Sequence, residues 1–386
     1  MAWLVALLAC AIDACGTVVA PARQPGHTAA ATAHPTSAPA ASPTPSCSNL
    51  QVLAGWGEAR VAAQLVVMPV DETDVGAAAD PVLEGAGGVI LFGSEAPANL
   101  GQQLGVLEQE STGWPAPLVM TDEEGGGVQR MANLAGSLPW PATMAATMTP
   151  TAVQDAVQEV AEQMSANGVT MDLAPVLDLA SGPGPDALHT DGPRSFGLSA
   201  ATATTFGLAF ARGLEAGGVI PVVKHFPGEG QATANTDDQP ASTPPYAELQ
   251  QADLLPFEAA VRAGLPAIMV GNATVPGLTS TPASLSSAVI QGLLRDQLGF
   301  TGLVMTDTLS AGAISDLGIG IPQAAVEAVE AGADMVLYTS LHPVAAFDQV
   351  VDALVSAVAQ GQLPIGMLDG AAEHVLAVKH VNLCAG

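Results

Sequence analysis

Eight short apolar runs that alternate with longer helical segments constrain the fold of this 386-residue chain more than any other feature. The runs are rich in Val, Ile, Leu and Met, and they span 65–70, 88–92, 118–121, 170–174, 220–224, 268–271, 303–306 and 335–338. Segments of helical period follow at 99–109, 152–167, 201–216, 247–263, 287–297, 322–331, 345–359 and 367–381. We expect four helices to end at glycine caps, Gly168, Gly217, Gly264 and Gly332. This alternation indicates parallel strands whose faces are covered by helices.

Two α/β architectures fit this alternation, an open doubly wound sheet and a closed barrel. The count of eight strands favours the (β/α)8 TIM-type barrel. About half of the residues are apolar (49%), which is enough for a large core. No Pro/Ser-rich linker interrupts residues 47–386, so we expect one catalytic domain there. Functional side chains of such a barrel lie on the loops that follow the carboxyl ends of the strands.

The first 46 residues have a different composition from the rest. Residues 1–20 are hydrophobic, and their apolar run of about a dozen residues is too short to span a bilayer comfortably, which is typical of an export signal. Leu7-Leu8-Ala9-Cys10 resembles a lipoprotein signal, and Cys15 is a second candidate for lipid attachment. Residues 21–46 are rich in Ala, Pro, Ser and Thr and predict a flexible tether. We therefore expect an exported protein of the cell envelope, anchored by lipid on the outer side of the cytoplasmic membrane.

Two further cysteines, Cys47 and Cys384, stand at the two ends of the predicted catalytic domain. In an exported protein, a pair placed in this way suggests a disulfide that joins the ends of the domain. The alternative is two unpaired thiols.

The charge of the chain excludes several kinds of partner. Nine Lys and Arg residues stand against 37 Asp and Glu residues, giving a net charge of −28. So acidic a chain is unsuited to nucleic acid and to electrostatic binding on anionic lipid. We expect a monomer whose partner is its substrate, with membrane contact only through the lipid anchor.

Polar residues follow the predicted strands at the positions where a barrel carries its active site. They are Asp122, Asp178, Lys224, His225, Asn272 and Asp307. With Arg130 and Arg194, and without a Cys/His cluster, they indicate chemistry without metal or cofactor on a polyhydroxylated substrate. One carboxylate can serve as nucleophile and another as acid/base. Taken singly, such carboxylates also occur as helix caps or ion-pair partners.

Six ordered sequence blocks contain most of these polar residues. The blocks are T-D-E-E-G-G-G-V-Q-R at 121–130, D-L-A-P-V-L-D at 172–178, R-S-F-G at 194–197, K-H-F-P-G-E-G at 224–230, P-A-S-L-S at 282–286 and G-F-T-G-L-V-M-T-D-T-L-S at 299–310. They resemble blocks of family 3 glycoside hydrolases, in the single-domain β-N-acetylglucosaminidase branch with its exported bacterial lipoproteins. They correspond in that family to D-Q-E-G-G-R-V-Q-R, N-F-A-P-V-L-D, R-S-F-G, K-H-F-P-G-H-G, P-A-S-L-S and G-F-x-G-V-V-x-S-D-D-L-S.

This resemblance implies a role for each matching position. Asp307 corresponds to the nucleophile, which forms a covalent glycosyl-enzyme with retention of configuration. The sugar-binding positions are Asp122, Arg130, Arg194, Lys224 and His225. The implied substrates carry terminal N-acetylglucosamine, as peptidoglycan fragments do.

The loop after Lys224-His225 departs from the family. Its D-S-H segment, which supplies the acid/base histidine, is here Asn235-Thr236-Asp237, and Glu229 replaces the histidine of P-G-H-G. Asp237 is therefore our candidate acid/base. Three interpretations stay open: a β-N-acetylglucosaminidase with an atypical acid, the same chemistry on another β-glycoside such as a glucoside, and a cell-envelope lipoprotein that binds sugar without hydrolysing it.

Overall fold

Eight parallel strands form one closed barrel in the computed structural model, which describes residues 47–111 and 113–385. The barrel strands are β1 (Val66–Asp71), β2 (Gly88–Phe92), β3 (Leu118–Thr121), β6 (Met171–Asp172), β7 (Ile220–Phe226), β8 (Ala267–Val270), β9 (Leu303–Thr308) and β10 (Met335–Leu337). Their order around the barrel is β1-β10-β9-β8-β7-β6-β3-β2. This closure confirms the (β/α)8 prediction and excludes the open sheet. The predicted export signal, Cys10, Cys15 and the tether lie outside the described residues.

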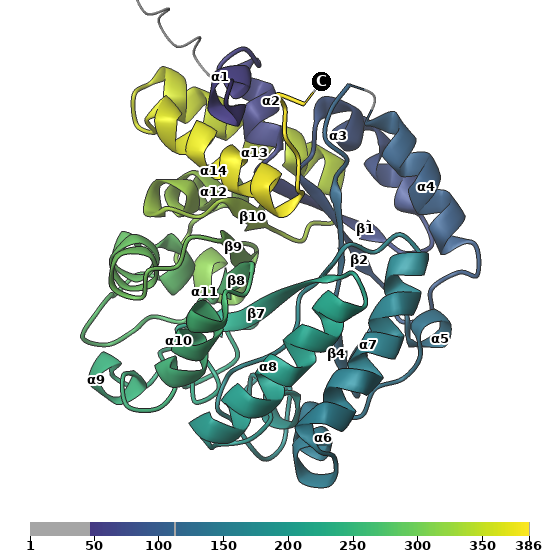
Figure 1. Ribbon diagram of the computed structural model, residues 1–386. Coiled ribbons are helices and arrows are strands. Elements are labelled where there is room, and N and C mark those ends of the chain that lie inside the picture. Colours follow the sequence, from purple (N-terminus) through teal and green to yellow (C-terminus); the bar gives the residue numbers. More distant parts are fainter. Residues whose placement is uncertain (1–46, 112, 386) are drawn as a thin grey trace, which may run out of the picture. The chain divides into compact units, whose positions relative to one another are not determined.

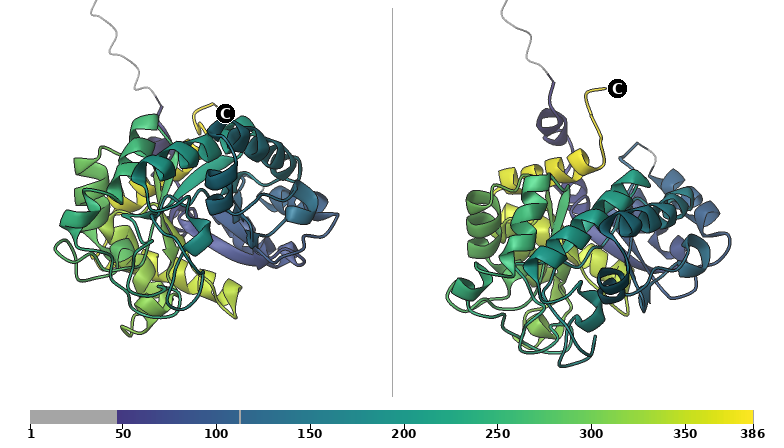
Figure 2. Two further views of the ribbon diagram at one scale, coloured as in Figure 1. Left: turned by 90° about the horizontal axis from the view of Figure 1, so that it is seen from below. Right: turned by 60° about the horizontal axis from the view of Figure 1, so that its bottom comes forward.

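Helices surround the barrel on its outside, as Figures 1 and 2 show from three directions. The longer ones are α4 (Leu100–Glu110), α7 (Pro150–Ala166), α8 (Ala200–Ala216), α10 (Leu254–Ala263), the π-helix η4 (Ala288–Gln297), α12 (Ile321–Ala331), α13 (Pro343–Ala359) and α14 (Ile365–Val378). The shorter ones are α1 (Asn49–Leu53), α2 (Glu58–Ala63), η1 (Val75–Ala78), α3 (Ala79–Glu84), α5 (Ala132–Ala135), α6 (Pro141–Thr147), η2 (Gly192–Arg194), α9 (Tyr246–Leu249), η3 (Ala283–Leu285) and α11 (Gly312–Ser315). In the described part, no helix is both long and apolar enough to cross a bilayer.

Helices α7 and α8 show how the sequence produces this ring. Val153 and Val157 lie one turn apart on α7 and are fully buried, so one face of the helix is apolar. On α8, glycine allows the two helices to approach closely. A Cβ at Gly213 would lie 2.6 Å from the Gln154 carbonyl oxygen, a distance that real side chains do not reach.

The structure differs from the sequence-based prediction at three elements. The single helix predicted over 247–263 is two helices, α9 and α10, because Pro256 lacks an amide hydrogen and fits only the first turn of a new helix. The strand predicted over 170–174 pairs only at Met171–Asp172. Helix α8 does end at Gly217, but the left-handed residue is its neighbour Gly218, with φ of 84°.

A disulfide between Cys47 and Cys384 joins the ends of the domain, as predicted, with the two Cα atoms 5.9 Å apart. Asn49 strengthens this junction. Its side-chain amide donates to the Val381 carbonyl at 3.0 Å, and its oxygen accepts from the Leu383 amide at 2.8 Å. Helix α1 therefore lies beside the C-terminal segment that follows α14 (Figure 1).

We expect the double substitution Cys47→Ser with Cys384→Ser to lower the free energy of unfolding by about 2–5 kcal/mol, because the crosslink restricts the unfolded chain. Urea unfolding of the folded domain measures this loss. The barrel should keep its fold below the unfolding transition, since the disulfide joins only the two ends of the domain. An equal urea midpoint for the wild-type protein with and without reductant would contradict the prediction.

Candidate active site

A cavity of about 430 Å³ opens where the carboxyl ends of the barrel strands meet. Its lining includes all seven active-site residues predicted from the sequence: Asp122, Arg130, Arg194, Lys224, His225, Asp237 and Asp307. Two of them lie further inside their strand than expected, because β7 continues through Lys224 and His225 to Phe226. Both of these side chains nevertheless reach the cavity from the carboxyl end of β7.

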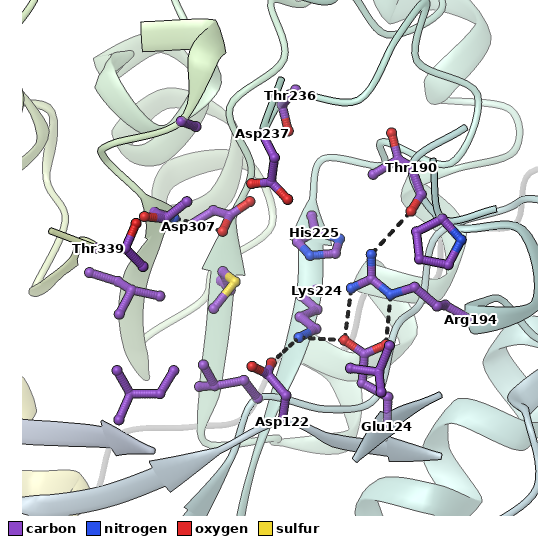
Figure 3. Close-up of a pocket in the computed structure, with 18 of the residues that line it drawn as sticks. Asp122, Glu124, Thr190, Arg194, Lys224, His225, Thr236, Asp237, Asp307 and Thr339 are labelled. Carbon is purple, nitrogen blue, oxygen red and sulfur yellow. Dashed lines mark hydrogen bonds and ion pairs between the residues drawn. The ribbon is translucent and has the colours of Figure 1, made fainter. Parts of the chain in front are cut away.

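A buried network of ion pairs forms the deep end of the cavity (Figure 3). The Lys224 ammonium lies 2.8 Å from Asp122 Oδ1 and 2.7 Å from Glu124 Oε1. Arg194 donates to both carboxylate oxygens of Glu124 at 2.7 Å, a bidentate pair. Arg130 lies at the edge of the network, 3.5 Å from Asp122 Oδ2. The network therefore holds two carboxylates and three cations together at the floor of the site.

The charges of this network keep its members ionised. Burial alone would lower the pKa of Lys224, but the carboxylates of Asp122 and Glu124 outweigh burial and hold its pKa above the ordinary value. Burial would raise the pKa of Asp122, but Lys224 and Arg130 hold it below the ordinary range. The site thus offers fixed charges of both signs, which suit the hydroxyl groups of a sugar.

Replacing Lys224 with methionine should lower the free energy of unfolding by about 3–5 kcal/mol, because Asp122 and Glu124 would remain buried after losing the ammonium group that they share. Urea unfolding at neutral pH measures the loss. A matched control is Arg262→Met, since Arg262 is 67% exposed and pairs with Glu258 on the surface of α10 at 3.2 Å. That substitution should lower the free energy of unfolding by at most about 0.5 kcal/mol. Equal losses in the two variants would contradict the structural role of the buried network.

His225 is oriented by Asp178 from behind the cavity. The Asp178 carboxylate accepts from His225 Nδ1 at 2.7 Å and from the His225 backbone amide at 3.0 Å. Burial lowers the pKa of His225, so the ring is neutral near neutral pH. Because Nδ1 then carries the hydrogen that Asp178 accepts, Nε2 is left to accept a hydrogen bond from a ligand.

Asp191 is a second buried carboxylate beside Asp178, and it is only weakly satisfied. It lies 3.3 Å from Arg194 Nη1, yet neither of its oxygens has a well-aligned donor among the described residues. Burial, and then the charge of Asp178, raises the pKa of Asp191 to about 7. Burial also raises the pKa of Asp178, to about 6, although the backbone amides of Glu229 and His225 act to lower it. Asp191 therefore keeps its proton to about pH 7 in the folded protein.

This proton makes stability depend on pH in a defined direction. The unfolded chain releases the Asp191 proton near about pH 4, whereas the folded protein keeps it to about pH 7. The folded protein therefore binds more protons in this window, and the free energy of unfolding falls as pH rises through it. We expect Asp191→Asn to remove this part of the fall, as urea unfolding between about pH 5 and about pH 8 measures. Asp186→Asn, at an exposed position, is the control that should leave the fall unchanged.

Three groups of the site are of the kind that ligates metals. Atoms of Asp178, Asp191 and His225 lie within 4.8 Å of one another, the one such group found among the described residues. Asp178, however, already accepts three hydrogen bonds, from His225 Nδ1, the His225 amide and the Glu229 amide. A metal ion would have to displace them. The arrangement therefore fits a hydrogen-bonding support for His225 better than a metal site.

Two further carboxylates face the cavity from its upper part. Asp307 lies near the end of β9, where its Oδ1 accepts from the Thr308 amide at 2.6 Å. Asp237 lies in the long loop after β7, and its carboxylate points into the cavity toward Asp307 and His225 (Figure 3). Burial raises the pKa of both carboxylates, and the charge of Asp237 raises the pKa of Asp307 further. Two such groups can divide the roles of nucleophile and acid between them.

The loop that carries Asp237 is held in place at two points of its backbone. The Gly312 amide donates to the Asp237 carbonyl at 2.8 Å, and the Ala313 amide donates to the Thr236 carbonyl at 2.9 Å. A Cβ at Gly312 would lie 2.4 Å from the backbone of Asp238, so only glycine allows this contact. The segment after β9 therefore positions both Asp307 and the loop above it.

Glu229 supports the same loop from below. It is 1% exposed, accepts from the Ala273 amide at 2.5 Å and lies 3.4 Å from the Thr236 hydroxyl. Burial raises its pKa well above the ordinary range. Glu229 thus connects the end of β8 to the residue next to Asp237 and does not line the cavity.

Sequence reasoning missed two buried acidic residues of the site, Glu124 and Asp191, and it gave no role to two others, Asp178 and Glu229. Glu124 stands two positions after Asp122 in the same glycine-rich block, which was the available signal. Asp178 was noted at a strand end without a role. Nothing in the local sequence distinguishes Asp191, because its importance comes from Asp178 and Arg194 beside it.

The comparisons with known proteins agree on one family. A family model described as "Glycosyl hydrolase family 3 N terminal domain" matches residues 63–378. Beta-hexosaminidase LpqI of Mycobacterium tuberculosis is 36% identical over 304 residues, which cover 76% of each chain. A solved GH3 glycosyl hydrolase from Mycobacterium smegmatis is 37% identical with a TM-score of 0.76, covering 84% of this chain and 98% of its own.

A second solved structure extends this agreement beyond mycobacteria. Beta-N-acetylhexosaminidase from Beutenbergia cavernae is 30% identical with a TM-score of 0.76, and the match covers 84% of this chain and 99% of the other. These findings confirm the resemblance predicted from the sequence blocks. The chain belongs to glycosyl hydrolase family 3.

Proposed function

We propose that this protein is a retaining, exo-acting β-N-acetylglucosaminidase that removes terminal N-acetylglucosamine, including that of peptidoglycan fragments. The names of the relatives support this proposal, since they are beta-hexosaminidases and a beta-N-acetylhexosaminidase. The observation that carries it is the pair of carboxylates, Asp307 and Asp237, facing each other over a floor of buried charges.

The two carboxylates take complementary roles in the reaction. Asp307 attacks the anomeric carbon and forms a glycosyl ester, while Asp237 gives its proton to the departing oxygen. In the second step Asp237 takes a proton from water, the water oxygen bonds to the anomeric carbon, and the ester bond breaks to restore Asp307. The raised pKa of Asp237 supports its role as the acid of the first step, because a higher pKa favours the protonated carboxyl group.

The floor of the cavity binds the sugar ring. Asp122 and Lys224 present a carboxylate and an ammonium side by side, Arg130 and Arg194 add guanidinium groups, and neutral His225 adds an acceptor. These groups are already ordered by their mutual ion pairs, so binding a sugar orders little that was mobile. A rigid binding floor of this kind aligns the anomeric carbon with Asp307.

The location of the protein belongs to the same proposal. The hydrophobic start of the chain, the cysteines Cys10 and Cys15 and the tether-like composition of residues 21–46 support an exported, lipid-anchored protein of the cell envelope. The protein then acts as a monomer on cell-wall saccharides outside the cytoplasmic membrane.

A panel of 4-nitrophenyl β-glycosides tests the proposed function. Turnover of the N-acetylglucosaminide, well above that of the glucoside, is the expected result. Preferential turnover of the glucoside would instead indicate the same chemistry on another sugar. Binding of N-acetylglucosamine without turnover of any glycoside would indicate a sugar-binding lipoprotein and would contradict the proposal.

A further inference from the structure

Three hydroxyl side chains form a hydrogen-bonded chain on the cavity wall next to Asp307. Thr308 Oγ1 lies 2.9 Å from Ser310 Oγ, and Ser310 Oγ lies 2.7 Å from Thr339 Oγ1. The Thr339 amide donates to Ser310 Oγ at 3.0 Å. All three residues line the cavity, and Thr339 lies beside Asp307 on the side away from Arg194 (Figure 3). We refer to Thr308, Ser310 and Thr339 as the hydroxyl chain.

The hydrogen-bond capacity of Ser310 leaves the two ends of the hydroxyl chain free to bind a ligand. A serine hydroxyl has one hydrogen and two lone pairs. Ser310 accepts from the Thr339 amide, so it must donate to one neighbouring hydroxyl and accept from the other. Either Thr308 or Thr339 then keeps a free O–H, while the other offers lone pairs. One donor and several acceptors side by side suit the hydroxyl groups of a saccharide.

The hydroxyl chain leads from the nucleophile toward solvent. Thr308 and Ser310 are half-buried and Thr339 is exposed, whereas Lys224 and Glu124 at the floor are buried. If the enzyme is exo-acting, as proposed above, only the terminal sugar fits over the closed floor. The rest of the substrate must then extend out of the open end of the cavity. Asp237, which is exposed, also lies at this end.

We propose that Thr308, Ser310 and Thr339 form the subsite for the leaving-group sugar, so that the enzyme favours a saccharide over an apolar group at that position. This inference rests on the proposed glycosidase function. It makes Thr339, at the solvent end, a specificity-determining residue that contacts the leaving sugar but not the sugar that is transferred to Asp307.

The same subsite should accept a sugar as nucleophile in the second step. The hydroxyl oxygen of the acceptor sugar bonds to the anomeric carbon of the glycosyl-enzyme, and its proton passes to Asp237. The ester bond breaks, and its electron pair returns to the Asp307 carboxylate. Transfer to a sugar is then in competition with hydrolysis, and the hydroxyl chain favours transfer.

The test compares kcat/KM of Thr339→Val for two substrates with the same terminal sugar. These are N,N′-diacetylchitobiose, whose leaving group is a sugar, and 4-methylumbelliferyl N-acetyl-β-glucosaminide, whose leaving group lacks sugar hydroxyls. Valine has the shape of threonine but lacks the hydroxyl group, so Thr339→Val removes only a hydrogen bond to the leaving sugar. This loss should lower kcat/KM for chitobiose about fivefold or more. The value for the aryl substrate should stay within about twofold.

The matched control is Thr281→Val, which removes a hydroxyl from the exposed Thr279–Thr281 pair outside the cavity. It should leave both substrates unaffected. A second measurement is the ratio of transfer to hydrolysis with added N-acetylglucosamine, which should fall in Thr339→Val and not in Thr281→Val.

Two results would overturn the inference while the proposed function stands. One is an equal change, or no change, of kcat/KM for both substrates in Thr339→Val. The other is a changed preference between aryl N-acetylglucosaminide and aryl glucoside, which would place the hydroxyl chain against the substituent at C2 of the transferred sugar. A wild-type protein that hydrolyses neither substrate would instead refute the proposed function, and the inference with it.

Discussion

Replacing Asp307 with alanine is expected to abolish turnover of the aryl N-acetylglucosaminide, with a loss of at least about 10⁴-fold in kcat. The side chain of Asp307 faces the cavity near the end of β9, and no other carboxylate of the site takes its place beside the anomeric carbon in the proposed arrangement. Initial rates with the 4-nitrophenyl substrate measure the loss. Binding of N-acetylglucosamine should persist, because the charged floor of the cavity stays intact.

The matched control for Asp307→Ala is Thr308→Val, at the next residue of the same strand. It removes a hydroxyl group and leaves every carboxylate of the site in place, so aryl turnover should remain within about tenfold of wild type. Substantial turnover by Asp307→Ala would show that another group is the nucleophile. Loss of sugar binding in that variant would show that the substitution disturbed the floor and not only the chemistry.

Replacing Asp237 with alanine is expected to lower kcat/KM for one class of substrate only. A good leaving group such as 4-nitrophenolate departs without protonation, so formation of the glycosyl-enzyme should proceed at nearly the wild-type kcat/KM. A sugar leaving group needs the proton, and kcat/KM for N,N′-diacetylchitobiose should fall about 10²–10⁴-fold. Added azide should restore the second step, since it attacks the glycosyl-enzyme without general-base help.

Asp238→Ala is the control for this prediction, because Asp238 is the exposed neighbouring carboxylate and does not line the cavity. It should hydrolyse both substrates at close to wild-type rates. If Asp237→Ala also keeps its activity on chitobiose, then Asp237 is not the acid. If both substrates lose activity equally and azide has no effect, the loop has a structural role only.

The backbone that holds Asp237 explains why an aspartate can act at this position. Aspartate is shorter than histidine, so the loop must bring it close to the reacting atoms. The bonds from Gly312 and Ala313, and the support of Thr236 by Glu229, fix the loop above Asp307. The replacement of two loop histidines by acidic residues is therefore accompanied by contacts that keep the loop near the site.

Much of this protein could be predicted from its sequence because the relevant signals are local. Strand and helix periods depend on neighbouring residues, and their count indicated the barrel. The rule that strand ends carry the active site selected six residues. Four of them, Asp122, Lys224, His225 and Asp307, line the cavity, whereas Asp178 and Asn272 do not. Pro256, by contrast, lies in the first turn of α10, and the prediction of a single helix over 247–263 did not allow for the boundary before it.

The tertiary structure decided what these residues do to one another. Lys224 meets Asp122 across 102 residues of sequence, and Arg194 meets Glu124 across 70. Contacts between residues so far apart in the sequence depend on how the barrel closes, and closure is a property of all eight strands together. The sequence by itself therefore determined the fold class and the kinds of reactive group. Only the closed barrel decided which carboxylates are paired with a cation, which have a raised pKa, and which face the cavity, because those states depend on burial and on neighbours that no local pattern contains.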